Sequence, residues 1–192
     1  MSQLNQSAPP VEVKATANYF RFDPLPKSDT YVFTLVGYNY LESTPFNRTD
    51  EKTKAKTVVN GQGIEWFLGT MVDGKPYFVK TWPVFYSISD RANYSKWYKA
   101  MTGALPTPAQ RPDDCLGRGV LVPVELVDKV SSKGTKYKAT KVGAPSAVPS
   151  ILAATVTKLK DLDKPFKEAL AKSDQSATGG KADAGDDEDA PF

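Results

Sequence analysis

Between Lys75 and Phe85, a strand-like segment carries the side chains best suited to binding chemistry. Phe78, Lys80 and Trp82 fall at every second position, so strand alternation puts them on one face. Two aromatic rings with a cation between them can stack on the bases of a single nucleic-acid strand and hold its phosphate. The competing interpretation is that the two rings fill a core and that the lysine extends to its rim. The segment alone leaves both interpretations open.

Other aromatic and basic residues could extend such a site. Tyr38 and Tyr40 share one parity in the most strand-like segment, residues 30–41. Lysines cluster in residues 52–56 and again in residues 129–141, where no acid occurs. Such lysines contact backbone phosphates without reading base sequence, whereas the alternative for each cluster is a solvated loop. The full candidate set for single-stranded DNA is Tyr38, Tyr40, Lys52, Lys54, Lys56, Phe78, Lys80, Trp82, Lys133, Lys136 and Lys138.

The composition argues against most enzyme classes. The 192 residues include no histidine and one cysteine, Cys115, which removes the commonest general base and the usual zinc ligands. The glycine-containing triplets at 61–63 and 117–119 lack the lysine and the spacing of a phosphate-binding loop. Neighbouring acids such as Asp113 and Asp114 are typical of a solvated turn rather than a metal site. We therefore expect a binding protein with no catalytic residue, no metal and no cofactor.

Strand and turn patterns indicate how the candidate residues are positioned. Asp73 and Gly74 form a strong hairpin signal between two strand-like segments, which should pair antiparallel. Residues 42–62 are polar and are expected to form a long mobile connection, a kind of segment that often binds ligands. Strands are expected at residues 30–41, 64–72, 75–85, 119–127 and 135–142, and residues 11–22 could add an edge strand.

A change of period marks one amphipathic helix at residues 89–101. Ser89 can cap its start and Gly103 can end it. Its apolar positions recur at helical spacing, which favours core packing over a role in the site. These positions are Tyr94, Trp97, Tyr98 and Met101.

The order of three strands, one helix and two strands predicts a mainly β fold, an OB-like five-stranded antiparallel barrel, in preference to a sandwich or an α/β sheet. In that fold the first loop and the last hairpin flank the binding groove, so both lysine clusters would lie beside the strand that carries Phe78 and Trp82. Residues 1–10 should form a flexible arm and residues 11–172 the binding domain. Near the end of that domain, residues 155–162 could form a strand and Pro165 could open a short helix. Residues 173–192 are expected to be a disordered linker and an acidic tip.

Charge is divided unevenly along the chain. The twenty residues after Lys172 contain six acids and one lysine, so the whole-chain charge of +3 leaves +8 on the preceding residues. A basic body suits a polyanion. The acidic tail can compete for the same surface or simply aid solubility.

The last seven residues, DDEDAPF, form a more specific pattern. An acidic run followed by Pro191 and a terminal Phe192 resembles the acidic C-terminal tip of bacterial and bacteriophage single-stranded DNA-binding proteins, with Ala190 in place of a larger aliphatic residue. Residues 87–150 are similar, more loosely, to the helix and last strand pair of phage replication proteins of this type. The resemblance implies that the acids meet a basic rim on a partner and that the phenylalanine enters an apolar pocket. The partner-binding set is Asp186, Asp187, Glu188, Asp189, Pro191 and Phe192.

The residues and the resemblance together predict a sequence-tolerant protein that coats single-stranded DNA in phage replication, recombination or repair. Its tip would recruit a polymerase, helicase, primase or nuclease. Residues 11–86 do not match the core of the tetrameric bacterial proteins, so we expect a monomer or weak self-association. An acidic-tailed protein-interaction module and an RNA-binding OB protein are the alternatives. No signal peptide or bilayer-spanning apolar run is present, so we expect a cytoplasmic location, in the host if the chain is phage-encoded, and no membrane partner.

Overall fold

The computed structural model describes residues 22–49, 53–130 and 134–178, which form a mainly β structure with few helices. The predicted strand at residues 11–22 lies outside these residues, except for Phe22. The predicted strands at residues 119–127 and 135–142 and the helix correspond closely to observed elements. Those at residues 30–41 and 64–72 fall within longer strands, and the segment 75–85 is divided into two strands. The elements are β1 (Asp29–Thr49), β2 (Lys56–Val72), β3 (Lys75–Lys80), β4 (Val84–Phe85), α1 (Asn93–Thr102), η1 (Pro112–Cys115), β5 (Gly119–Val130), β6 (Lys136–Val142), η2 (Ser150–Thr155) and α2 (Leu159–Thr178).

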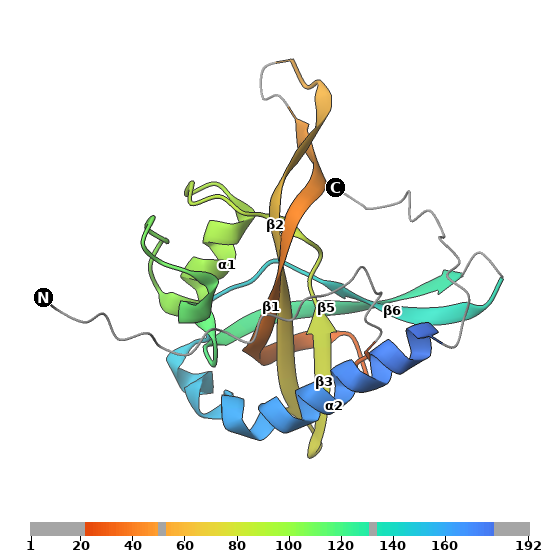
Figure 1. The fold of residues 1–192 in the computed structure, drawn as a ribbon. Coiled ribbons are helices and arrows are strands. Elements are labelled where there is room, and N and C mark those ends of the chain that lie inside the picture. Colours follow the sequence, from red (N-terminus) through yellow and green to blue (C-terminus); the bar gives the residue numbers. More distant parts are fainter. Residues whose placement is uncertain (1–21, 50–52, 131–133, 179–192) are drawn as a thin grey trace, which may run out of the picture.

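The strands form one antiparallel six-stranded sheet in the order β3-β2-β1-β5-β6, with β4 paired to β2 (Figure 1). Residues 29–34 of β1 pair with residues 119–124 of β5, so β1 lies in the interior of the sheet. Residues of β3 and β6 approach within 8 Å between Cα atoms, but these strands do not pair within the described ranges. The sheet is therefore open, and the predicted closure into a five-stranded barrel is not observed.

The segment between β1 and β2 differs from the sequence expectation. The two strands stay paired as far as Thr49 and Lys56, so most of residues 42–62 form a two-stranded arm that rises beyond the sheet (Figure 1). The prediction of a mobile connection was wrong because both faces of the outer arm meet solvent, and its polar composition resembles that of a loop. The turn between β2 and β3 is confirmed, with φ of 50° at Asp73 and 75° at Gly74 as a two-residue hairpin turn requires.

Helix α1 covers the main core on one side of the sheet. Its four predicted apolar residues are all buried, and the Tyr94 ring stacks on Trp66 with centroids 5.8 Å apart. The helix ends as predicted at Gly103, whose φ of 84° suits glycine. It begins later than predicted, because the Ser89 carbonyl accepts a turn hydrogen bond from the Ala92 N–H and Ala92 takes the N-cap position.

Helix α2 packs on the opposite side of the sheet, across β1, β2 and β3 (Figure 1). Leu162 and Phe166 are buried there, forming a second apolar cluster with sheet residues. The strand alternative for residues 155–162 is thus replaced by η2 and the start of α2. Pro165 lies inside the helix instead of opening it, and the helix continues to Thr178, into the segment predicted to be a linker. No helix in the described part of the chain is long and apolar enough to cross a membrane.

Candidate functional site

Strand β2 separates two sides of the sheet by strict alternation. Its side chains at Ile64, Trp66 and Leu68 are buried in the main core with α1. The intervening positions face the opposite side, which we call the outer face. From the arm toward α2, the β2 residues of the outer face are Gly61, Gly63, Glu65, Phe67 and Gly69.

Helix α2 covers one end of the outer face. The predicted base contact Phe78 lies there with only 5% of its surface exposed, and its ring centroid is 5.3 Å from that of Phe166 and 6.0 Å from that of Phe22. In this structure Phe78 is therefore a core residue, as the competing interpretation of the segment required. The helical spacing of Leu159, Leu162 and Phe166 is the sequence signal that could have indicated a helix covering this face.

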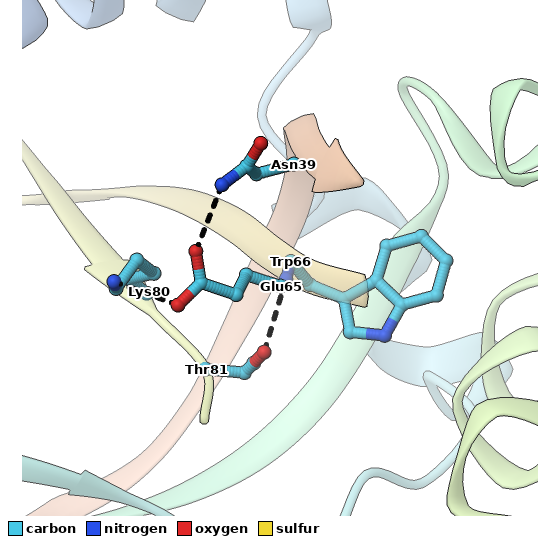
Figure 2. A network of polar contacts seen from close by, with 5 residues as sticks. All are labelled: Asn39, Glu65, Trp66, Lys80 and Thr81. Carbon is cyan, nitrogen blue, oxygen red and sulfur yellow. Dashed lines mark hydrogen bonds and ion pairs between the residues drawn. The ribbon is translucent and has the colours of Figure 1, made fainter. Parts of the chain in front are cut away.

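The middle of the outer face holds a polar network around Glu65 (Figure 2). The Lys80 Nζ donates to Glu65 Oε1 at 2.8 Å, and the Asn39 Nδ2 donates to Glu65 Oε2 at 3.1 Å. The Glu65 side chain is 9% exposed and that of Lys80 is 27% exposed. Lys80 thus lies on the predicted face, but a largely buried carboxylate already neutralises its charge.

Trp82 follows directly, at a point where the chain is pinned to β2. The Thr81 Oγ1 accepts a hydrogen bond from the Trp66 N–H at 3.0 Å, and the Thr81 N–H donates to the Trp66 carbonyl oxygen, also at 3.0 Å. Trp82 itself is 51% exposed, and the Lys129 Nζ of β5 lies 5.9 Å from the centroid of its ring. An exposed aromatic ring from the β3–β4 connection and an ammonium group from β5 are thereby brought together. Sequence reasoning noted Lys129 in the basic stretch but did not select it, because its proximity to Trp82 is a tertiary contact.

Tyr38 and Tyr40 do not extend this surface. A bulge between Leu35 and Gly37 shifts the phase of β1, so Tyr38 pairs with Trp66 and Tyr40 with Ile64, on the side of the main core. The Tyr38 hydroxyl donates to Asp113 Oδ1 at 2.8 Å, and burial raises its pKa. Tyr40 is 39% exposed beside Tyr86, and desolvation raises its pKa to about 12.

The predicted lysines are dispersed. Lys54 and Lys56 are exposed at the outer part of the arm. On the β5–β6 hairpin, Lys129 pairs with Tyr137, so the exposed Lys136 and Lys138 alternate to the other side of that hairpin. Lys52, Lys133 and the six residues of the predicted tip lie outside the described residues.

The described residues contain no group of three cysteines, aspartates or glutamates arranged to hold a metal ion. The outer face does present an exposed aromatic ring, Trp82, beside the ammonium group of Lys129. No family model, curated protein or solved structure matches this chain.

Proposed function

We propose that the chain is a non-enzymatic protein that binds single-stranded DNA without sequence preference. The observation that carries the proposal is the exposed Trp82 ring with the Lys129 ammonium 5.9 Å from its centroid. An exposed indole stacks on any base, because every base has a π-face, and an adjacent ammonium group is positioned to meet the phosphate that follows. The ring, from the segment between β3 and β4, and the cation, from β5, lie close enough for one nucleic-acid strand to contact both.

The strand order supports a finer proposal, that the sheet is an OB-like barrel with an incomplete seam. Apart from the two-residue β4, the order β1, β2, β3, α1, β5 and β6, with β1 next to β5 and β3 approaching β6, follows the connectivity of that fold. OB-folds bind oligonucleotides on the face of their second and third strands, between the first and last hairpin loops. Trp82 is the second residue after β3, and Lys129 belongs to the β5–β6 hairpin, which approaches β3.

The charge pattern supports a polyanionic ligand and a second role for the acidic end. The residues up to Lys172 carry +8. Lysines on the β1–β2 arm and on the β5–β6 hairpin can displace the counterions condensed on a nucleic acid when they contact its phosphates. We propose that the tip, through its acids and Phe192, recruits replication, recombination or repair proteins. This part of the proposal depends on the resemblance of DDEDAPF to the tips of single-stranded DNA-binding proteins.

A titration of the full chain with fluorescently labelled oligo-dT, the matching duplex and oligo-rU tests the function. We expect oligo-dT to bind more tightly than duplex and its affinity to fall as salt rises. Equal affinity for oligo-dT and duplex at near-physiological salt would contradict the proposal. Tighter binding of oligo-rU would identify the RNA-binding alternative, and no binding of any of the three would favour the protein-interaction alternative.

A further inference from the structure

Two phenylalanines that the sequence did not single out lie at the arm end of the outer face. The rings of Phe46 on β1 and Phe85 on β4 are packed edge to face, with centroids 5.2 Å apart and an interplanar angle of 89°. Phe85 is 42% exposed and Phe46 is half-buried. The pair is therefore a fixed aromatic surface with part of its area open to solvent.

The two rings lie directly on glycine backbone. A Cβ at Gly61 would be 2.3 Å from Phe85 Cε2, and one at Gly63 would be 3.0 Å from Phe46 Cζ. Any larger residue at Gly61 would displace the Phe85 ring, because real Cβ atoms do not approach so closely. Both glycines belong to the outer face of β2, so the rings lie on the same side of that strand as the Glu65 network.

The chain fixes the distance between this aromatic pair and Trp82. Phe85 follows Trp82 by three residues, so their Cα atoms are at most about 10 Å apart. Both ends of this short segment are attached to β2: Thr81 bonds to Trp66, and the Tyr86 N–H donates to the Gln62 carbonyl oxygen at 2.9 Å. Aromatic surfaces so close together can be reached by bases of one short oligonucleotide.

We propose that Phe85, supported by Phe46, is a second stacking subsite for an unpaired base of the same strand that Trp82 binds. This inference rests on the proposed function. The occupant is a nucleobase because the exposed surface is aromatic and lies within three residues of Trp82, beside which Lys129 supplies positive charge. A second copy of the chain is a poorer fit, since a stable interface needs roughly 800 Å² from each partner. Among the described residues of the arm, Val59 is the one further exposed large apolar side chain on this face, which is too little for such an interface.

The test is a length series of oligo-dT titrated against the wild-type chain and Phe85→Ala, at low salt. Oligonucleotides long enough to reach both subsites should lose about 5- to 150-fold in affinity, the equivalent of one stacked base. The shortest oligonucleotides that still bind should be unaffected, because Trp82 holds them alone. Phe85→Leu keeps the apolar volume without the π-face and should behave as Phe85→Ala does, whereas Phe85→Trp should retain the affinity. Ile151→Ala, which removes an 87% exposed apolar side chain on η2, is the matched control and should change nothing.

The outcomes separate the subsite from the proposed function. If Phe85→Leu is folded and binds oligo-dT of every length as wild type does, while Trp82→Ala weakens binding, the subsite is wrong and the function stands. If wild type binds no oligo-dT, the function itself fails. If Phe85→Leu changes sedimentation from a self-associated to a monomeric form without altering DNA affinity, a second copy covers the patch and the subsite is again wrong.

Discussion

At the scale of single residues, the tryptophans occupy opposite environments. Trp66 and Trp97 are buried in the main core, whereas Trp82 presents half of its surface to solvent. Burial of Trp97 is what helical spacing predicted. Strand alternation could not decide whether Trp82 is buried. It places a side chain on one face of a sheet but does not tell what covers that face.

Trp82→Ala should weaken oligo-dT binding by roughly 1 to 3 kcal/mol, since a stacking partner is lost. The free energy of unfolding, measured by urea denaturation, should change little because the side chain is largely exposed. Trp97→Ala serves as the opposite control and should cost about 3 to 5 kcal/mol of stability. A large loss of stability in Trp82→Ala, with unchanged affinity in the folded protein, would make Trp82 a core residue.

The lysines at the site should also differ in role. Lys129→Met should make the fall of log affinity with log salt shallower, reducing the absolute slope by about 0.7, the value of one phosphate contact on a single strand. Lys80→Met should leave that slope nearly unchanged, because Glu65 already neutralises Lys80. It should instead lower the free energy of unfolding by about 1 to 3 kcal/mol, since the Glu65 carboxylate loses its cation and keeps the Asn39 hydrogen bond. A shallower salt dependence in Lys80→Met than in Lys129→Met would contradict the view that Lys129, and not Lys80, contacts phosphate.

Alkaline pH should destabilise the fold. Desolvation raises the pKa of the Cys115 thiol from 9.0 to about 12, and that of the Tyr98 hydroxyl from 10.0 to about 12. Between the ordinary and the raised values the folded chain keeps protons that the unfolded chain has lost, so stability is full below about pH 9 and falls as the pH rises toward 12. Thermal melts from pH 7 to 11 measure this, and Cys115→Ala should show a weaker decline. A melting temperature that rises from pH 9 to 11 would show that the sign is wrong.

At the scale of elements, α2 divides the outer face of the sheet into a buried part and an exposed part. Its Leu162 and Phe166 cover the part of the outer face that contains Phe67 and Phe78. What is left uncovered begins at the Glu65 network and extends through Trp82 to the arm. The helix thereby limits where a ligand can reach the aromatic side chains of residues 75–85.

Phe166→Ala and Phe78→Ala should each cost about 3 to 5 kcal/mol of stability, because both remove large side chains from the second core. At a temperature where the variants remain folded, their oligo-dT affinity should equal that of the wild type. A selective loss of affinity in folded Phe78→Ala would return Phe78 to the binding surface and would mean that α2 is displaced when DNA binds.

Local signals predicted the elements that local physics determines. The Asp73-Gly74 turn, the apolar face of α1 and the β5–β6 pair all follow from residues near one another in the chain. The arm was missed because strands that are exposed on both faces have the composition of a loop. The positions of Tyr38, Phe78 and Lys129 depend on a bulge, a covering helix and a cross-strand contact, none of which has a local signature.

At the scale of the whole molecule, the division of charge between the body and the C-terminal residues should affect the affinity for DNA. Residues 179–192 contain five acids and one lysine, so deleting them raises the formal charge from +3 to +7. The basic body would then face a polyanion without a competing acidic segment on the same chain.

Deletion of residues 179–192, which leaves α2 intact, should tighten oligo-dT binding, most visibly at low salt where screening is weak. Deletion of Phe192 alone should barely change DNA affinity but should abolish capture of replication or repair partners, because an apolar anchor carries much of the energy of a small interface. Unchanged DNA affinity across salt in the longer deletion, together with partner capture that does not need Phe192, would reduce the tail to a solubility device.

The interior position of β1 has a consequence for how the molecule is made. Its second edge is completed only by residues 119–124, so most of the chain must leave the ribosome before that pairing can form. Until then, the nascent chain exposes unpaired backbone groups along an apolar strand, a known template for aggregation. Non-local pairing of this kind also slows folding to milliseconds or longer. Fragments that end between α1 and β5 should therefore accumulate in inclusion bodies, whereas chains that extend through α2 should refold from denaturant.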